Sequence, residues 1–130
     1  MEAAAASGEA HPVAGGQKIT FHAPSDKVFA AIVKVLNLSD RTVDATNKDS
    51  GLIATAIDIK GGYKQTGTRI VITVISISDS ETLVRIASTE QKRYNGLQTE
   101  PWSDPKVDDT ATAAVVAELQ PKISDELAMK

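Results

Sequence analysis

A stretch of alternating apolar residues, TRIVITVISISDSETLVRIASTEQ at residues 68–91, restricts the possible folds more than any other part of the chain. Alternation with a period of two is typical of a β-strand, whose successive side chains point to opposite faces of a sheet. The first half is apolar on both faces, with Ile70, Ile72 and Val74 on one and Val71, Ile75 and Ile77 on the other. Such a strand belongs in the middle of a sheet. The polar segment SDSE then reverses the chain, so the stretch predicts a long antiparallel hairpin.

A second hairpin is predicted just before it, in RTVDATNKDSGLIATAIDIKGG at residues 41–62. Its two strands are separated by four turn-forming residues, Asn47, Asp49, Ser50 and Gly51. Gly51 is expected to adopt a positive φ, which other residues adopt at a cost. The second strand has small side chains on one face, at Leu52, Ala54 and Ala56, and we expect a helix to lie close against that face.

Residues 25–38 have the apolar spacing of a helix and follow the short strand KITFHAP at residues 18–24. Ser25 is the expected N-cap, and the helix should end near Leu38. Its apolar stripe consists of Val28, Phe29, Ile32, Val33 and Leu36.

A second helix is predicted in DDTATAAVVAELQPKISDEL at residues 108–127, with Asp108 or Asp109 as its N-cap. Its expected inner stripe is Ala111, Val115, Leu119 and Ile123. Pro121 removes one helical hydrogen bond and clashes with the preceding turn, at about 3 kcal/mol. We therefore expect the helix to kink or end there.

This order of elements, β-α-β-β-β-β-α, predicts an α+β fold: an antiparallel sheet of four to five strands with two helices on one face. The length of 130 residues suits a single domain. We predict a disordered leader at residues 1–17, because it is rich in Ala and Gly and has no apolar periodicity. The domain then covers residues 18–124, and residues 125–130 form a loose tail.

Composition excludes several classes of function. The chain has no Cys, which excludes disulfides, thiolate metal sites and a Cys nucleophile. Its net charge of −3 weighs against nucleic acid as the main partner, because phosphate binding needs a concentrated positive surface. No apolar run approaches the ~20 residues of a transmembrane helix.

Catalytic and metal-binding patterns are also missing from the sequence. Neither His11 nor His22 has a partner at a spacing typical of metal ligands. Three glycines lie between strands rather than before a helix, which favours a flexible hairpin loop over a phosphate-binding loop: Gly61, Gly62 and Gly67. We predict no catalytic residue, no metal and no cofactor.

The long connection KRYNGLQTEPWSDPKVD, at residues 92–108, holds the candidate interface residues Arg93, Tyr94 and Trp102. Aromatic residues and Arg are the usual anchors of protein interfaces, and long loops often carry function. The alternative is structural: Trp102, the single tryptophan, folds back as a lid on the core and holds the loop in place. The sequence favours the lid slightly.

The segments ITFHAPSDKVFAAIVKVL and TVDATNKDSGLIAT, at residues 19–36 and 42–55, resemble a recurrent bacterial pattern. They are similar to the helix-grip domains of small envelope lipoproteins, including the outer-membrane-assembly lipoprotein C. The likeness covers residues 18 to about 120. It implies a periplasmic or outer-membrane-associated protein, with a lipid tether on a Cys outside this chain. The opening APSDKVFAAI also resembles START and Bet v 1-like domains, which have a longer chain and a more aromatic ligand cavity.

These observations lead to three hypotheses of function. The first is a non-enzymatic envelope module that binds another envelope protein or has a structural role. The second is a carrier of a small apolar ligand between the sheet and the C-terminal helix, which predicts a cavity of a few hundred Å³ lined by Ile and Val. The third is an enzyme whose carboxylates meet only in the fold. A binding module predicts instead a filled core and an exposed patch near the long loop.

Overall fold

The computed structural model describes residues 15–129. The predicted leader, residues 1–17, therefore lies outside the described residues except for its last three. The last of these, Gln17, is already the first residue of a strand.

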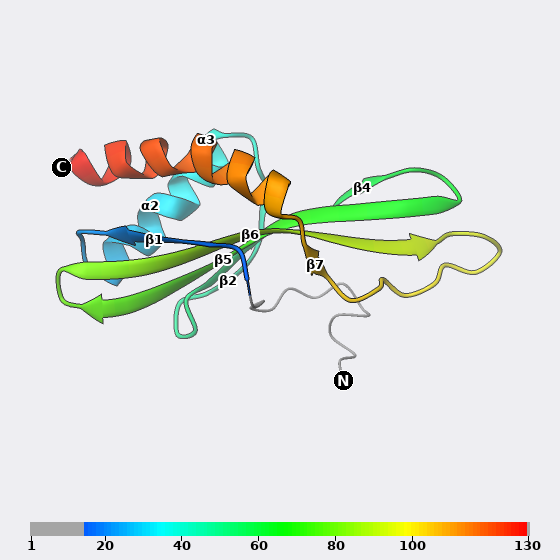
Figure 1. The fold of residues 1–130 in the computed structure, drawn as a ribbon, viewed down its shortest axis with the longest axis horizontal. Coiled ribbons are helices and arrows are strands. Elements are labelled where there is room, and N and C mark those ends of the chain that lie inside the picture. Colours follow the sequence, from blue (N-terminus) through cyan, green and yellow to red (C-terminus); the bar gives the residue numbers. More distant parts are fainter. Residues whose placement is uncertain (1–14, 130) are drawn as a thin grey trace.

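A long ribbon of two strands forms the centre of the fold: β5, Lys64–Ser78, and β6, Glu81–Tyr94 (Figure 1). Five further strands pair with it or extend the sheet: β1 Gln17–Phe21, β2 Val43–Asn47, β3 Leu52–Thr55, β4 Asp58–Lys60 and β7 Lys106–Val107. The order is β1-β6-β5-β3-β2, with β4 on β5 and β7 on β6, and every pairing is antiparallel. The predicted α+β fold is confirmed. The sheet has seven strands rather than four to five, because two short ones join its long ribbon.

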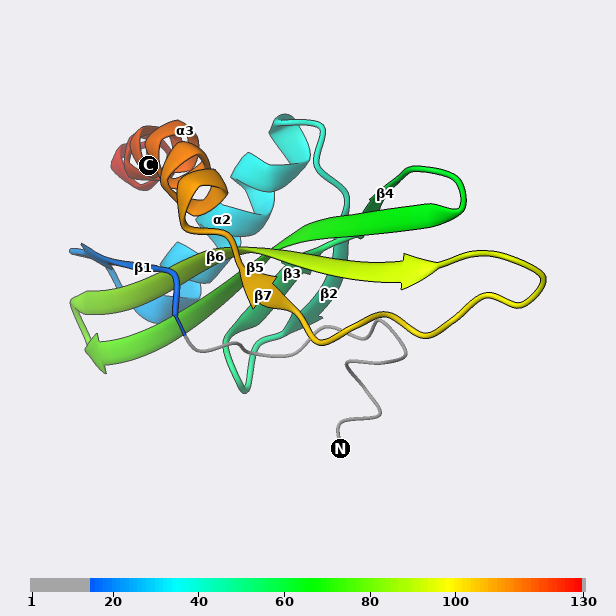
Figure 2. The ribbon, with the colours of Figure 1, turned by 45° about the vertical axis from the view of Figure 1, so that its right-hand side comes forward.

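Two helices, α2 Ser25–Leu38 and α3 Asp109–Ala128, cover the same face of the sheet (Figures 1 and 2). The core between them contains apolar side chains from both helices and from five strands, among them the fully buried Ile32, Ile72, Ile86, Leu119 and Ile123. As predicted, β5 is a central strand and Gly51 has a positive φ, of 76°. The buried Ile side chains thus hold the helices to one half of the ribbon.

The N-cap of α3 is one of the two residues predicted, whereas the N-cap predicted for α2 was wrong. The Asp108 carboxylate accepts a hydrogen bond from the Ala111 amide at 3.0 Å and caps α3. Ser25 is instead the first helical residue of α2, and the extended residue before it, Pro24, occupies the cap without a side-chain bond. A proline carbonyl can accept the first helical hydrogen bond, and here the Val28 amide donates to it at 3.0 Å.

The expected end of α3 at Pro121 and the loose tail at residues 125–130 were wrong, because α3 continues to Ala128. Pro121 has no amide hydrogen to donate to the Ala117 carbonyl. Both residues face solvent, so water can donate to that carbonyl instead. Beyond the proline, Ile123 is fully buried and Leu127 packs against the core. These contacts hold the last turns in helical form.

The predicted faces of two elements also need correction. The inner stripe of α3 is Thr112, Val116, Leu119 and Ile123, so its first half is shifted by one residue from the prediction. The helices do not lie on the face of Leu52 and Ala54 either. Ile53 joins the helix-covered core, whereas Leu52 and Ala54 form a small cluster with Val71 on the other face. The small size of the side chains at Leu52 and Ala54 did not show which face of β3 the helices cover, because both faces are buried.

The ribbon continues past both helices into a projection that we call the distal arm, residues 58–68 and 89–107 (Figures 1 and 2). It consists of β4, the adjoining ends of β5 and β6, β7 and the connection between β6 and β7. All three predicted interface residues lie in this arm.

Candidate functional site

Trp102 is buried within the distal arm, with 7% of its surface exposed. Its ring lies on Gly67 of β5: a Cβ built at Gly67 would lie 3.0 Å from the ring and 2.7 Å from Ile57 Cγ2. A glycine inside a strand is typical of such a close approach. The prediction that Gly67 belongs to a flexible loop was wrong. It is a strand residue that makes room for the indole.

Arg93 stacks on the Trp102 ring, with its guanidinium carbon 4.0 Å from the ring centroid. Its Nε also donates a hydrogen bond to Gln65 Oε1 at 2.7 Å, and Gln65 is its register partner on β5. A guanidinium over an indole is attracted by the negative face of the ring. Arg93 is thereby fixed in place on the arm.

The connection after β6 is fastened along the edge of that strand. Ser103 donates its amide to the Lys92 carbonyl at 2.8 Å, and its Oγ accepts from the Lys92 amide at 2.9 Å. The Glu100 amide donates to the Tyr94 carbonyl at 3.0 Å. These bonds place Trp102 over the ribbon. Trp102 is thus a lid, but a lid on the arm: it belongs to neither of the two core clusters.

The tip of the arm exposes aromatic and aliphatic side chains. Tyr63 is 64% exposed and Tyr94 44% exposed, with ring centroids 5.4 Å apart, and Leu97 is fully exposed. The Asn95 amide donates to the Tyr63 carbonyl at 2.7 Å and holds the two loops of the tip side by side. Of the two aromatic residues among the predicted interface residues, only Tyr94 therefore has an exposed ring.

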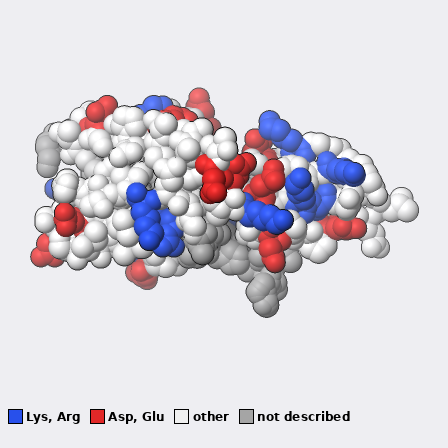
Figure 3. Space-filling model, in the orientation of Figure 1, with Lys and Arg blue, Asp and Glu red and all other residues white. Residues whose placement is uncertain are grey.

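The tip is also positively charged, although the whole chain has a net charge of −3. Residues 59–66 and 91–99 contain no carboxylate and four cations, Lys60, Lys64, Lys92 and Arg93. Figure 3 shows Lys and Arg side chains gathered over this end of the molecule, with carboxylates among and behind them. Lys60 lies 3.8 Å from Asp58 in an exposed ion pair.

A groove of about 510 Å³ lies between these cations and the connection after β6. It is lined by Lys64, Thr66, Lys92, Tyr94 and Pro101, together with Gln65, Arg93, Glu100 and Ser103. Lys64, Thr66, Lys92 and Tyr94 share one face of the ribbon, because Lys64 is opposite Tyr94 and Thr66 is opposite Lys92 in the register. Trp102 occupies the other face, that of Gly67 and Arg93.

A second hollow, a cleft of about 480 Å³, lies between α3, the loop after α2 and the sheet. Its lining is largely polar and includes Arg41, Arg69, Asp58 and Thr68, with Val115 from α3. Arg69 is buried; it donates to the Thr55 carbonyl at 3.0 Å and to Asp44 at 3.3 Å. Burial lowers the pKa of Arg69, and the Asp44 charge opposes that shift.

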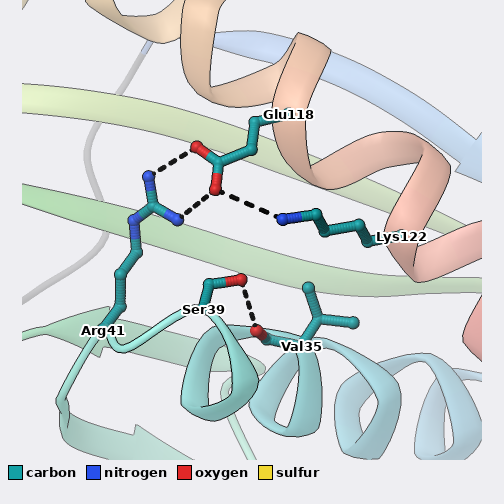
Figure 4. A network of polar contacts seen from close by, with 5 residues as sticks. All are labelled: Val35, Ser39, Arg41, Glu118 and Lys122. Carbon is teal, nitrogen blue, oxygen red and sulfur yellow. Dashed lines mark hydrogen bonds and ion pairs between the residues drawn. The ribbon is translucent and has the colours of Figure 1, made fainter.

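Beside this cleft, Arg41 donates two hydrogen bonds to Glu118, at 2.8 and 2.7 Å, and so joins the loop after α2 to α3 (Figure 4). Lys122 lies 3.6 Å from the same carboxylate. The hydrogen bond from Arg41 holds the pKa of the Glu118 carboxyl below its ordinary 4.5. The same bond raises the pKa of Arg41. With two hydrogen bonds to one carboxylate, the Arg41–Glu118 pair links the loop after α2 to α3.

No cluster of three or more His, Asp or Glu side chains arranged to hold a metal is present among residues 15–129. His22 is exposed on the body, with Nδ1 3.3 Å from a Glu81 oxygen, and His11 lies outside the described residues. Asp44 lies on β2 in the body, and Glu90 lies on β6 within the distal arm.

The sequence did not identify Tyr63, which precedes β5, or Lys64, the first residue of β5, as parts of the same surface as Tyr94. The hairpin register pairs Lys64 with Tyr94. Extending the predicted hairpin outward from its SDSE turn brings Lys64 opposite Asn95, one residue out of step, because the structure has a register shift between Ser76 and Ser78.

No protein-family model matches this chain, and comparison with curated proteins finds no significant match. Within the part of the chain that the structure describes, neither helix has the length and apolarity needed to cross a membrane.

Proposed function

We propose that this protein is a non-enzymatic binding module of the cell envelope, which contacts another protein through the tip of its distal arm. The observation that carries the proposal is the concentration of exposed apolar side chains there. Among residues 15–129, eight large hydrophobic side chains are exposed, and four of them lie on the arm: Ile59, Tyr63, Tyr94 and Leu97. Clustered exposed apolar residues with a polar rim are typical of protein interaction sites.

The arm is also suited to binding because it is held in one shape before a partner arrives. Trp102 and Arg93 stack on the ribbon, and both edges of the ribbon are occupied, by β4 on one side and by the connection on the other. A preorganised surface loses less conformational entropy on association. Tyr rings contribute contact area with few rotatable bonds. The envelope location rests on the resemblance of residues 19–36 and 42–55.

The proposal is tested by removing the apolar tip. The variant Tyr63→Ser/Tyr94→Ser/Leu97→Ser is compared with a matched body variant, Leu38→Ser/Ile77→Ser/Met129→Ser, which also loses three exposed hydrophobic side chains. Each protein is immobilised and exposed to a bacterial envelope extract, and captured proteins are quantified by mass spectrometry. We expect at least one protein that the wild type and the body variant retain and the tip variant loses. Purified, that protein should bind the wild type directly.

If every captured protein is retained equally by the tip and body variants, the arm is not the contact surface and the proposal fails. Unchanged circular dichroism and Trp102 emission in the tip variant would show that the arm is still folded. Trp102 is suited to this control because it is the only tryptophan in the chain.

A second candidate function, a small-ligand carrier, is favoured by the cleft beside α3. Its volume of about 480 Å³ lies within the usual range of ligand pockets. The lining differs from the predicted Ile and Val, because Asp, Arg and Thr side chains dominate it. A polar or amphiphilic ligand fits it better than the apolar one predicted. Native mass spectrometry of protein purified from its host should find a bound small molecule, which Val115→Trp, a cleft-filling substitution, would displace.

A further inference from the structure

The unpaired cations of the distal arm point to the chemistry of its partner. Lys64, Lys92 and Arg93 form no ion pair with a carboxylate in the part of the chain that the structure describes. Lys64 lies 6.0 Å from the Tyr94 ring centroid, and Arg93 stacks on Trp102. The whole arm has five cations and four carboxylates, so the excess of positive charge is confined to residues 59–66 and 91–99, where it attracts an acidic partner.

The way the ribbon edges are occupied restricts how a partner can bind. At the arm, the outer edge of β5 pairs with β4, and the outer edge of β6 bonds to Glu100 and Ser103. A peptide therefore cannot add as another strand directly to β5 or β6 here, and the outer edges left in the arm belong to the short strands β4 and β7. The larger open surface is the face of the ribbon, where the groove of about 510 Å³ lies.

The spacing of the two lysines on that face selects a pattern of acidic residues. Lys64 and Lys92 are diagonal neighbours in the register, because Lys64 is opposite Tyr94 and Thr66 is opposite Lys92. Diagonal neighbours in an antiparallel pair are roughly 7–8 Å apart. In an extended chain, side chains two residues apart share a face at roughly 7 Å. Two carboxylates separated by one residue thus match the two ammonium groups.

Resting on the proposed function, we infer that the arm recognises an extended acidic segment of its partner protein. Two acidic side chains with one residue between them bind Lys64 and Lys92, and a neighbouring apolar side chain packs on Tyr94 and Pro101. All four of these residues line the groove. The single groove carboxylate, Glu100, disfavours a segment with still more acidic residues at that end.

Fluorescence anisotropy with a short fluorescein-labelled peptide containing Glu-Thr-Glu-Phe tests the inference. Two control peptides contain Lys-Thr-Lys-Phe, which reverses the charge, and Glu-Glu-Thr-Phe, which places the carboxylates on opposite faces. We expect the first peptide to bind weakly, and both controls to bind about tenfold more weakly or worse. Binding should largely disappear near 1 M NaCl, where the Debye length is about 3 Å.

Protein variants locate the binding site. Lys64→Glu/Lys92→Glu should weaken binding about tenfold or more, because the two introduced carboxylates repel the acidic peptide. The matched control, Lys27→Glu/Lys48→Glu, changes the net charge equally at two exposed body lysines and should leave binding unchanged. Equal binding by both variants, or no binding up to about 1 mM peptide, would overturn the inference.

Failure of this inference is distinct from failure of the proposed function. Suppose that an envelope protein is captured through Tyr63, Tyr94 and Leu97 and that Lys64→Glu/Lys92→Glu captures it as well as the wild type does. The arm then binds protein, but the inference of an acidic segment is wrong. Vesicles with phosphatidylglycerol and a single-stranded oligothymidine are tested alongside the peptide. If either binds with dependence on Lys64 and Lys92 while the peptide does not, the partner is a phosphate surface and the inference is overturned.

Discussion

The two halves of the β5–β6 ribbon are built in different ways. In the body, Ile70, Ile72 and Ile86 are buried beneath α2 and α3 within the main core. In the distal arm, the same two strands have Gln, Thr, Lys and Arg side chains, and no helix covers them (Figure 2). In the arm, the packing of the Trp102 ring on Gly67 replaces a hydrophobic core.

This difference shows how a β-ribbon can be ordered beyond its hydrophobic core. In the body, stability comes from a large buried apolar area, which is shared among many residues. In the arm it depends on Trp102, on a few backbone bonds and on the Arg93 stack. Regions with few buried apolar contacts open locally at lower free energy than the core does. The arm therefore offers exposed side chains at the expense of local stability.

The largest effect is expected in the body, from Ile72→Ala. Ile72 is fully buried, and truncating it should lower the free energy of unfolding by about 4 kcal/mol, in the upper part of the range for a buried Ile. Urea denaturation followed by circular dichroism measures the loss. The matched control is Ile77→Ala on the same strand, where the side chain is 53% exposed and the loss should stay within about 0.5 kcal/mol. Similar losses for both would contradict the described core.

Trp102→Ala should give a smaller global loss, about 2 to 3 kcal/mol, although a buried Trp in a core loses about 3 to 5. The arm can open by itself once the indole is removed, so the body should keep its stability. Hydrogen exchange measures this region by region. We expect faster exchange at the amides of Lys92 and Glu100 and little change at Ile72. Uniformly faster exchange throughout the chain would show that arm and body unfold as one unit.

Gly67→Ala should destabilise the arm by about 1 to 2 kcal/mol, because the new methyl group overlaps the space of Trp102 and Ile57. Trp102 emission should shift to longer wavelength as the ring is displaced. Gly62→Ala is the matched control, since a Cβ there meets no atom within 4 Å. An unshifted emission in Gly67→Ala would mean that the ring does not rest on this glycine.

The smallest effect concerns Glu118, which belongs to the body. Its folded-state pKa is lowered, mainly by the hydrogen bond from Arg41, so its contribution to stability is present above the unfolded-state pKa near 4.5 and is lost as pH falls through the lower folded pKa. Because its side chain is 38% exposed, we expect less than about 1 kcal/mol. Glu118→Gln should thus be less stable than wild type at pH 7 and equal to it near pH 3.

Thermal unfolding of both proteins across this pH range measures the difference. A gap that persists unchanged at pH 3 would mean that the carboxylate charge is not its source. Trp102 emission should be the same in both proteins at each pH, because the Arg41–Glu118 pair lies in the body and not in the arm.

Much of the body was predictable because its determinants are local. The alternation in residues 68–91 identified the central hairpin, and Asp108 was one of the two caps expected from their place before an apolar helical pattern. Of the kink or end expected at Pro121, the end was wrong, because burial of Ile123 offsets the lost helical bond. The candidate site was predictable only in part: Tyr94 is exposed but ends β6, and Trp102 is buried as the favoured lid, but on the arm instead of the core.

The sequence by itself therefore determined the two helices, the main strands, the α+β class and the central position of β5, because apolar periodicity and turn residues act over a few neighbouring positions. Only the tertiary structure decided that Trp102 rests on Gly67, that Tyr63 meets Tyr94, and that four cations gather at the tip of an arm. These arrangements join segments far apart in the chain. They depend on the hairpin register and on the path of the connection after β6, and a one-residue change in register would turn the side chains of the shifted strand to the other face.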